Sequence, residues 1–351
     1  MYKGKDITMY DLAKELNVSV ATVSRALKDD PAVHKKTRKK ITDLATELGY
    51  QTNLFARNLR TKETKTIGFM IHELKSNFIN AVLSGVERIT AREGYDLIIA
   101  HSSESYDKEV ANARNLFHKR VDGLIASLAF ETKNLDHFKQ FTDRGIPIIF
   151  FDRVEKNNDY TVVIIDNYKC GYEATKHLID QGCKRIAHVT SSLTRNVYAD
   201  RYRGYKDALF DHHIQLDERL VIINDLSENA GIHSAKQLIK TKPLPDGAFI
   251  TNDFVAAAFM KMLTEYKIKV PKDIAVVGFN NDAISHLIAP TLTTINYPGI
   301  EMGEVAARSI INHLKGISNI NQINTVIISS KLVVRQSSQK TDQKAKSSTA
   351  V

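Results

Sequence analysis

Short apolar runs alternate with helical stretches along most of this 351-residue chain, from residue 66 to residue 335. The runs at residues 67–71 and 274–279 are typical, and both are almost continuously apolar. Such strands are buried on both faces, which indicates a parallel sheet covered by helices on each side. The pattern restarts near Val162. We therefore expect an α/β body of two doubly wound parallel-sheet halves that enclose a cleft.

The first sixty residues follow a different pattern, with two short helices joined by a tight turn. Thr8 and Ser19 suit the N-cap positions, and apolar side chains recur at helical spacing after each of them. This is the helix-turn-helix pattern, whose second helix enters the DNA major groove. A third helix is expected over about residues 35–48, and cations cluster near its start. Cations are unfavourable at that end of the helix dipole, so their position favours an anionic partner.

The net charge of +9 is concentrated in the N-terminal part of the chain. Residues 1–66 hold 14 Lys and Arg against 8 Asp and Glu, whereas residues 67–330 hold 30 against 31. A basic N-terminal domain suits the phosphate backbone of DNA. The sequence shows no secretory signal and no run long enough to span a membrane, so we expect a cytoplasmic protein without membrane contact. The two cysteines, Cys170 and Cys183, are expected to be reduced thiols.

No pattern in the sequence indicates catalysis. The twelve histidines do not cluster as metal ligands, and the sequence has no P-loop and no Gly-x-Gly-x-x-Gly motif. No set of residues assembles an acid, a base and a nucleophile. We therefore expect a binding protein rather than an enzyme, with no metal and no cofactor.

Several linked motifs resemble the LacI/GalR family of bacterial transcription regulators. In the N-terminal part they are Ala21-Thr22-Val23-Ser24-Arg25, Thr37-Arg38, Leu48-Gly49-Tyr50 and Asn53-x-x-Ala56-x-x-Leu59. In the body they include Asp152-Arg153, Asp166-Asn167, Arg201-x-x-Gly204-Tyr205, Asn252-Asp253 and Gly278-Phe279. The chain departs from the family pattern at Thr52, where Pro is usual, and at His34, where Ser is frequent.

The resemblance implies a division of the chain into domains. Residues 1–52 would form a small all-α helix-turn-helix DNA-binding domain, and residues 53–65 a hinge helix and linker. Residues 66–335 would form an effector-binding and dimerisation domain like the periplasmic sugar-binding proteins. Its first half would comprise residues 66–164 and 297–324, and its second half residues 165–296 and 325–335. Residues 336–351 are rich in Ser, Gln and Lys, and a disordered basic tail is expected there.

The resemblance also implies which residues contact DNA. Val20 and Ala21 match positions that read bases, and Arg25 matches one that touches phosphate and sometimes a base edge. Leu59 would be a core residue in most proteins, but in this family the matching leucine enters the minor groove. The complete predicted set is Thr8, Ser19, Val20, Ala21, Thr22, Ser24, Arg25, Asn53, Ala56, Arg57 and Leu59.

The predicted effector site lies at the carboxyl ends of the body strands. Arg201 and Asn252 match polar positions that hold the effector, and Asn280 stands where the family commonly has Asp. Such residues can instead cap helices, and this alternative applies to each of them. The complete predicted set is Phe78, Asp152, Arg201, Asn252, Asn280 and Tyr297.

Together these features predict a homodimeric transcription regulator, expected to be a repressor, that binds a palindromic DNA operator. A small molecule, with a sugar as the first expectation, would control it from the cleft. In an alternative interpretation the effector is a partner protein, as in the catabolite-control members of the family. A sugar-binding transport protein is a third interpretation, which the DNA-binding domain and the missing signal argue against.

Overall fold

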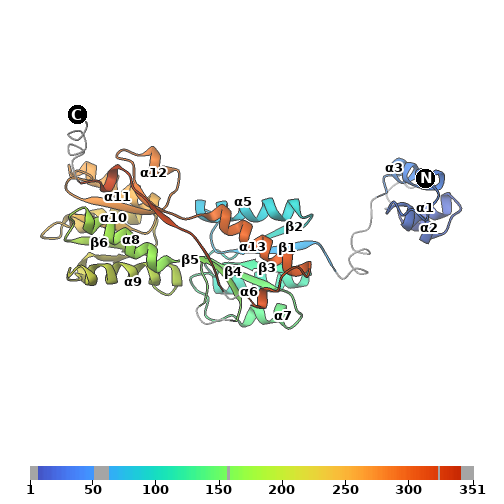
Figure 1. The fold of residues 1–351 in the computed structure, drawn as a ribbon, viewed down its shortest axis with the longest axis horizontal. Helices are drawn as coiled ribbons and strands as arrows, with labels where there is room; N and C mark the ends of the chain where they lie inside the picture. Colours follow the sequence, from blue (N-terminus) through green and yellow to red (C-terminus); the bar gives the residue numbers. More distant parts are fainter. Residues whose placement is uncertain (1–6, 51–62, 156–158, 323–324, 341–351) are drawn as a thin grey trace, which may run out of the picture. The chain divides into compact units, whose positions relative to one another are not determined.

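The computed structural model describes residues 7–50, 63–155, 159–322 and 325–340 (Figure 1). The chain forms two compact units, Met1–Thr64 and Lys65–Val351. We call them the head and the body, and we describe each by itself.

The described part of the head is a cluster of three helices, α1 (Met9–Glu15), α2 (Val20–Ala26) and α3 (Lys35–Glu47). Leu12, Val23 and Ile41 come from the three different helices and are completely buried together. Helix α3 ends in a turn at Gly49, whose φ of +65° lies in the left-handed region that glycine adopts without strain. Three short helices around one small core are what the apolar spacing predicts.

The first half of the body is built on a six-stranded sheet with the order β11-β5-β4-β3-β1-β2, in which all paired strands are parallel. Its β1 side chains alternate between two cores: Phe69 packs with α5 and α13, whereas Met70 packs with α6 and the segment around α7. The elements are β1 (Thr66–Ile71), α5 (Asn77–Arg92), β2 (Asp96–His101), α6 (Tyr106–His118), β3 (Gly123–Ala126), η1 (Asp136–Phe138), α7 (Lys139–Thr142), β4 (Ile148–Phe151), β5 (Thr161–Ile165), α13 (Gly299–Leu314), η3 (Ile320–Gln322) and β11 (Thr325–Ile328).

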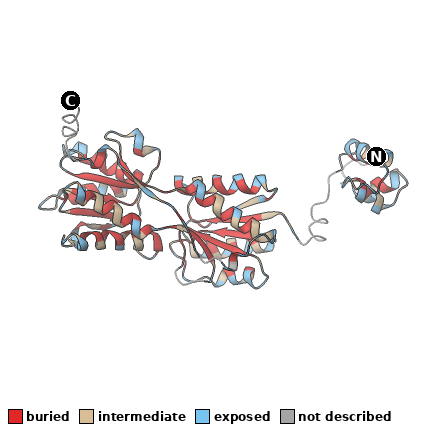
Figure 2. Cartoon of the chain, viewed as in Figure 1, coloured by how far each residue is buried: buried red, intermediate tan, exposed pale blue. Residues whose placement is uncertain are grey.

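The second half repeats this arrangement with the strand order β12-β10-β9-β8-β6-β7, and only β12 is antiparallel to its neighbour among the described pairs. In both halves the inner strands are mostly buried and the outer faces of the helices are exposed (Figure 2). The elements are α8 (Asn167–Asp180), β6 (Ile186–Thr190), α9 (Asn196–Asp211), η2 (Glu218–Leu220), β7 (Val221–Ile223), α10 (Glu228–Ile239), β8 (Gly247–Ile250), α11 (Asp253–Glu265), β9 (Ala275–Asn280), α12 (Ile284–Leu287), β10 (Thr293–Asn296), β12 (Lys331–Val333) and η4 (Gln336–Ser338).

Strand β11 corrects one predicted boundary. Residues 325–335 are predicted to belong to the second half, but β11 pairs in parallel with β5 of the first sheet. Its Ile328 is buried and joins the core of that sheet. The chain therefore crosses after β11 rather than before it, and only β12 belongs to the second sheet. A four-residue edge strand with alternating burial carries too little periodic signal to be assigned to either sheet from sequence.

The predicted disordered tail begins too early. Residues 336–338 form the short helix η4, and both Ser337 and Ser338 are completely buried. The Ser337 hydroxyl donates to the Val276 carbonyl at 2.6 Å and accepts from the Thr293 backbone N–H at 2.8 Å. The Ser338 hydroxyl bonds the side chains of Thr293 and His177. Polar composition predicts disorder because it offers little apolar surface, but these distant partners compensate both hydroxyls. Residues 341–351 lie outside the described residues.

Candidate functional site

Helix α2 exposes part of the predicted DNA-contact set. Ser19 caps the helix by accepting the Thr22 N–H at 3.1 Å, and Val23 holds the opposite face in the head core. Ala21 and Arg25 are exposed and lie four residues apart, so they share one face of the helix. This face could meet a DNA groove. Thr22 and Ser24 are partly exposed beside it.

Two other predicted contacts have structural roles in the head. Thr8 and Asp11 form a capping box, in which each side chain bonds the other's backbone N–H. Val20 is half-buried and packs against the head core, which leaves it less free to reach a base than Ala21. The remaining predicted contacts lie outside the described residues: Asn53, Ala56, Arg57 and Leu59.

The start of helix α3 presents positive charge to solvent. Its N-cap is His34, whose Nδ1 accepts the Lys36 N–H at 3.3 Å, so imidazole replaces the hydroxyl that is frequent in the family. Arg38 pairs with Asp29. The other cations of the first two turns are exposed: Lys35, Lys36, Lys39 and Lys40. This surface is suited to phosphate, which attracts such side chains without sequence preference.

In the body, four of the six predicted effector residues meet at the carboxyl ends of the strands. Phe78 at the start of α5 stacks on Tyr297 with ring centroids 3.9 Å apart. The Tyr297 hydroxyl donates to Oδ1 of Asp152, which follows β4. Burial raises the pKa of both side chains, and the nearby Arg153 opposes this effect at Asp152. At neutral pH Tyr297 therefore remains a protonated donor.

Arg201 completes this group from helix α9 of the second half. It is only 3% exposed, and its guanidinium carbon lies 3.5 Å from the ring centroid of Phe279 and 5.3 Å from that of Tyr297. Its Nε donates to Oδ1 of Asn167 at 2.8 Å. Rings and an amide thus hold the guanidinium in a fixed orientation, so its fork of donors is preorganised for an oxygen-rich ligand. We call Phe78, Asp152, Arg201 and Tyr297 the cleft cluster.

The two predicted asparagines bond elsewhere. Oδ1 of Asn252 caps helix α11 by accepting the N–H groups of Phe254 and Val255 at 2.9 and 3.1 Å. Nδ2 of Asn280 donates to Asp282 at 3.2 Å, and the residue has a φ of +117° at the end of β9. The helix-cap geometry anticipated as an alternative is therefore present at Asn252. Both residues nevertheless stand at strand ends that face the same edge of the sheet as Phe279.

Phe279 and Asn167 are absent from the predicted effector set, although both orient Arg201. Each stands where a strand or crossover ends, directly within a motif that the sequence analysis quoted, Gly278-Phe279 and Asp166-Asn167. The strand-end rule could have selected them. The rule does not predict that the Arg201 side chain lies over the Phe279 ring.

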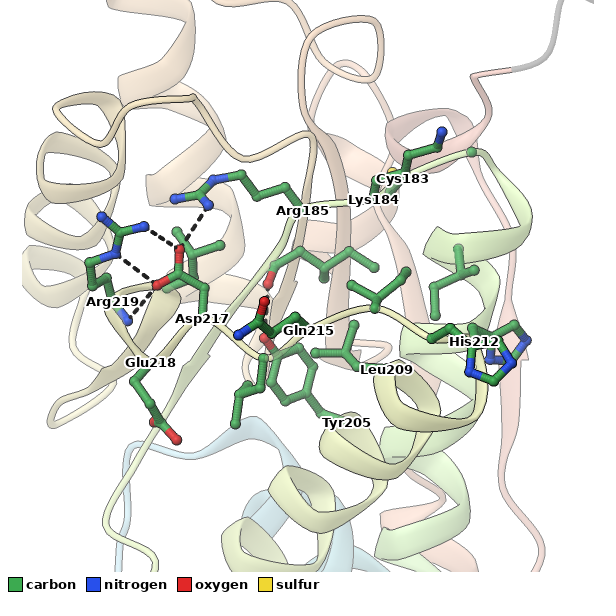
Figure 3. Close-up of a pocket in the computed structure, with 17 residues that line it drawn as sticks. Cys183, Lys184, Arg185, Tyr205, Leu209, His212, Gln215, Asp217, Glu218 and Arg219 are labelled. Carbon is green, nitrogen blue, oxygen red and sulfur yellow. Dashed lines mark hydrogen bonds and ion pairs between the residues drawn. The ribbon is translucent and has the colours of Figure 1, made fainter.

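A separate pocket of about 840 Å³ opens before the amino-terminal ends of β6 and β7 (Figure 3). It is lined by apolar side chains that include Tyr205 and Leu209, and by an ion-pair group in which Asp217 bonds both Arg219 and Arg185. The hydrogen bonds from Arg219, followed by that from Arg185, hold the pKa of Asp217 well below its usual range. Among the described residues that line this pocket, none belongs to the predicted effector set.

The head and the body each match a known family model. Residues 8–53 match the family model of bacterial regulatory proteins, lacI family, and residues 175–338 match that of the periplasmic binding protein-like domain. The catabolite control protein A of Priestia megaterium is 30% identical over 88% of this chain and 93% of its own length. The chain belongs to the lacI family. This confirms the resemblance seen in the sequence, and the relatives are transcription regulators rather than enzymes.

Solved structures of two transcription regulators share the fold. The complex of the transcriptional regulator CelR with cellobiose has a TM-score of 0.70 at 25% identity and covers 94% of this chain and 99% of that one. The Lac repressor dimer bound to operator and the anti-inducer ONPF has a TM-score of 0.85 at 24% identity, covering 95% and 99%. The predicted fold class is thus confirmed. Within the described residues, no helix has the length and apolar character required to cross a membrane.

Proposed function

We propose that this lacI-family regulator acts as a homodimeric repressor of a palindromic operator and responds to a small molecule held by the cleft cluster. Repression and DNA binding are properties of the family to which the chain belongs. The observation that carries the effector proposal is the cleft cluster itself. Side chains from both halves converge there, so a ligand that touches them would change how the halves sit against each other.

For DNA, the contacts divide by chemistry. The exposed lysines of α3 would bind phosphate. Arg25 would reach a base edge as well as phosphate, whereas Ala21 can meet only an apolar base edge such as a thymine methyl. The head would therefore obtain much of its specificity from Arg25 and from the hinge around Leu59, which lies outside the described residues. The two heads of a dimer would then occupy the two half-sites of the palindrome.

For the effector, the cluster favours a sugar or sugar derivative. Aromatic faces at Phe78 and Tyr297 can pack on the apolar face of a sugar ring, and Arg201 offers paired donors to adjacent hydroxyls. The similar CelR was solved with cellobiose. We further propose that the protein works in the cytoplasm, where its operator would be found.

One observation favours the alternative of a protein effector. Oδ1 of Asn252 is used in a helix cap, Nδ2 of Asn280 is bonded to Asp282, and Phe78 is stacked on Tyr297. Side chains that satisfy each other in this way need no ligand. A regulator whose signal arrives on the surface, from a partner protein, would retain such a cleft for its packing.

A thermal-shift screen against monosaccharides, disaccharides and phosphosugars distinguishes a sugar effector from a protein effector. A ligand that binds only the folded state raises the melting temperature. The sugar that raises it most is then tested for its effect on operator binding by wild type, Arg201→Lys and Arg203→Lys. Arg203 lies on the same helix and is 56% exposed in its side chain.

We expect Arg201→Lys to bind operator normally but to lose the response to the sugar, because a point charge cannot replace the planar fork. Arg203→Lys should keep both properties. A responsive Arg201→Lys protein, or a screen in which no sugar raises the melting temperature, would overturn the sugar site and leave the protein effector as the better proposal.

A further inference from the structure

The two halves of the body are joined by a second group of side chains beside the cleft cluster. It links the start of helix α9 in the second half to the chain that follows β3 and β4 in the first half. We call it the clasp, and it consists of Phe130, Thr132, Arg153, Arg195, Asn196 and Tyr198.

Direct hydrogen bonds cross between the halves in the clasp. Nη2 of Arg195 donates to the carbonyl of Thr132 at 2.6 Å and to that of Phe130 at 3.4 Å. Asn196 bonds the first half in both senses: its Nδ2 donates to the Asp152 carbonyl at 3.0 Å, and its Oδ1 accepts the Val154 N–H at 2.9 Å. These partners lie on two separate loops, so Arg195 and Asn196 fasten the start of α9 at two points.

Stacked groups reinforce these bonds. The rings of Phe130 and Tyr198 come from opposite halves and stack with centroids 5.7 Å apart at 21°. The Arg153 guanidinium lies 4.0 Å from the Phe130 centroid, donates to the Tyr198 hydroxyl at 3.4 Å, and pairs with Glu104 at 2.8 Å. Contacts with two rings and a carboxylate together hold Arg153 more strongly than any one of them would.

The polar side chains of the clasp are shielded from water, whereas the rings of Phe130 and Tyr198 are half-buried. Arg195 and Arg153 are each 5% exposed and Asn196 is 7% exposed. The nearest carboxylate of Arg195 is that of Glu155, whose oxygen is 3.7 Å from Nη1 and whose side chain is 53% exposed. The carbonyls of the first half therefore supply much of the compensation for this buried charge. Separating the halves would break several bonds at once, and this makes opening cooperative.

Asp152 connects the clasp with the cleft cluster. Its backbone carbonyl accepts from Asn196, whereas its carboxylate accepts from Tyr297. We propose that Arg195 and Asn196 are positioning residues that hold the two halves closed before any effector binds, so that an effector must release the clasp to enter the cleft. The second part of this inference, that an effector must release the clasp, rests on the proposed effector site. The closed state itself can be tested without effector.

The test is hydrogen exchange, resolved to single amides by mass spectrometry, on the full chain without added ligand. The variants are Arg195→Ala at the N-cap of α9 and, as a control that removes a charge from within that helix, Arg203→Ala. The reporter is the Val154 amide, which is bonded to Asn196 and not to Arg195. If the clasp opens as one unit, Arg195→Ala should accelerate exchange at Val154 by roughly tenfold or more. The substitution removes the bonds to the Phe130 and Thr132 carbonyls and leaves the bond between Asn196 and the Val154 amide itself untouched.

Exchange of the β1 amides, which lie inside the first sheet between β3 and β2, should remain slow in both variants. If they also accelerate in Arg195→Ala, that variant is generally unstable, and Arg195→Lys, which keeps the charge but loses the fork, must then show the selective effect at Val154. Unchanged Val154 exchange in a folded Arg195 variant, or equal acceleration in Arg203→Ala, would overturn the clasp. Neither result would affect the sugar screen, which tests the effector site separately.

Discussion

The buried carboxyl of Asp253 should make the stability of the body depend on pH in an unusual direction. Asp253 begins helix α11 and is completely buried. Its oxygens accept from the Thr294 hydroxyl at 2.7 Å and from the Asp282 N–H at 2.8 Å. Burial, with a smaller contribution from the charge of Asp282, raises the pKa of Asp253 to about 7 from 3.8.

The sign follows from proton binding. Between pH 4 and pH 7 the folded protein holds a proton at Asp253 that the unfolded chain has released, so the free energy of unfolding falls as pH rises through this range. A shift of about three units corresponds to about 4 kcal/mol at most. The contribution is complete below pH 4 and is lost as the pH passes 7. Ordinary carboxylates with lowered pKa, such as Asp225, act in the opposite direction.

Asp253→Asn isolates this effect, because the amide cannot ionise. Urea unfolding of wild type and variant is followed by circular dichroism at pH 5, 6, 7 and 8. The difference between their free energies of unfolding should change by about 3 kcal/mol over this range, in favour of the variant at pH 8. Asp282→Asn provides a second check, since removing the neighbouring charge should shift the transition to lower pH. Parallel pH profiles for wild type and Asp253→Asn would refute the reasoning.

Three further predictions concern packing, capping and DNA. Gly85→Ala should lower the free energy of unfolding by about 3 kcal/mol in urea titrations, because the new Cβ would lie 2.1 Å from the Ile300 carbonyl oxygen in the crossing of α5 and α13. Asn252→Ala should cost about 1 kcal/mol by losing the α11 cap, whereas Asn252→Asp should keep it; equal melting of the two would contradict the cap. Leu59→Ala should weaken operator binding in fluorescence anisotropy with unchanged melting, and early melting with normal binding would identify a core residue instead.

The fold could be predicted because its periodicity is explicit in the sequence. Continuous apolar runs such as residues 67–71 are buried on both faces, and Phe69 and Met70 indeed enter different cores. Edge strands lack this signal. Thr325 and Ile327 of β11 are exposed, so the strand resembles a loop until its pairing with β5 is known. The burial of Ser337 cannot be predicted from the sequence either, because its hydroxyl bonds backbone groups that are far away in the chain.

The site was only partly accessible to sequence reasoning. The predicted effector set includes Phe78, Asp152, Arg201 and Tyr297, and the structure brings these four together. The orientation of Arg201 depends on Phe279 and Asn167, and no spacing rule connects residues so distant. The same holds for the clasp. Arg195 bonds carbonyl oxygens, which carry no sequence identity, so no pattern of side chains could have revealed its partners.

Asp152 allows the two groups to be distinguished by substitution. The clasp uses its backbone carbonyl, and the cleft cluster uses its carboxylate, so a change of side chain acts directly on one of them. Asp152→Asn would still offer an oxygen to the Tyr297 hydroxyl but would remove the negative charge near Arg201. A change at Asn196 does the reverse, because it leaves the charge and the Tyr297 bond in place while releasing the backbone. If the effector acts by opening the clasp, Asp152→Asn should alter which ligands bind. A substitution of Asn196 should instead alter the binding free energy that any ligand must contribute to open the cleft.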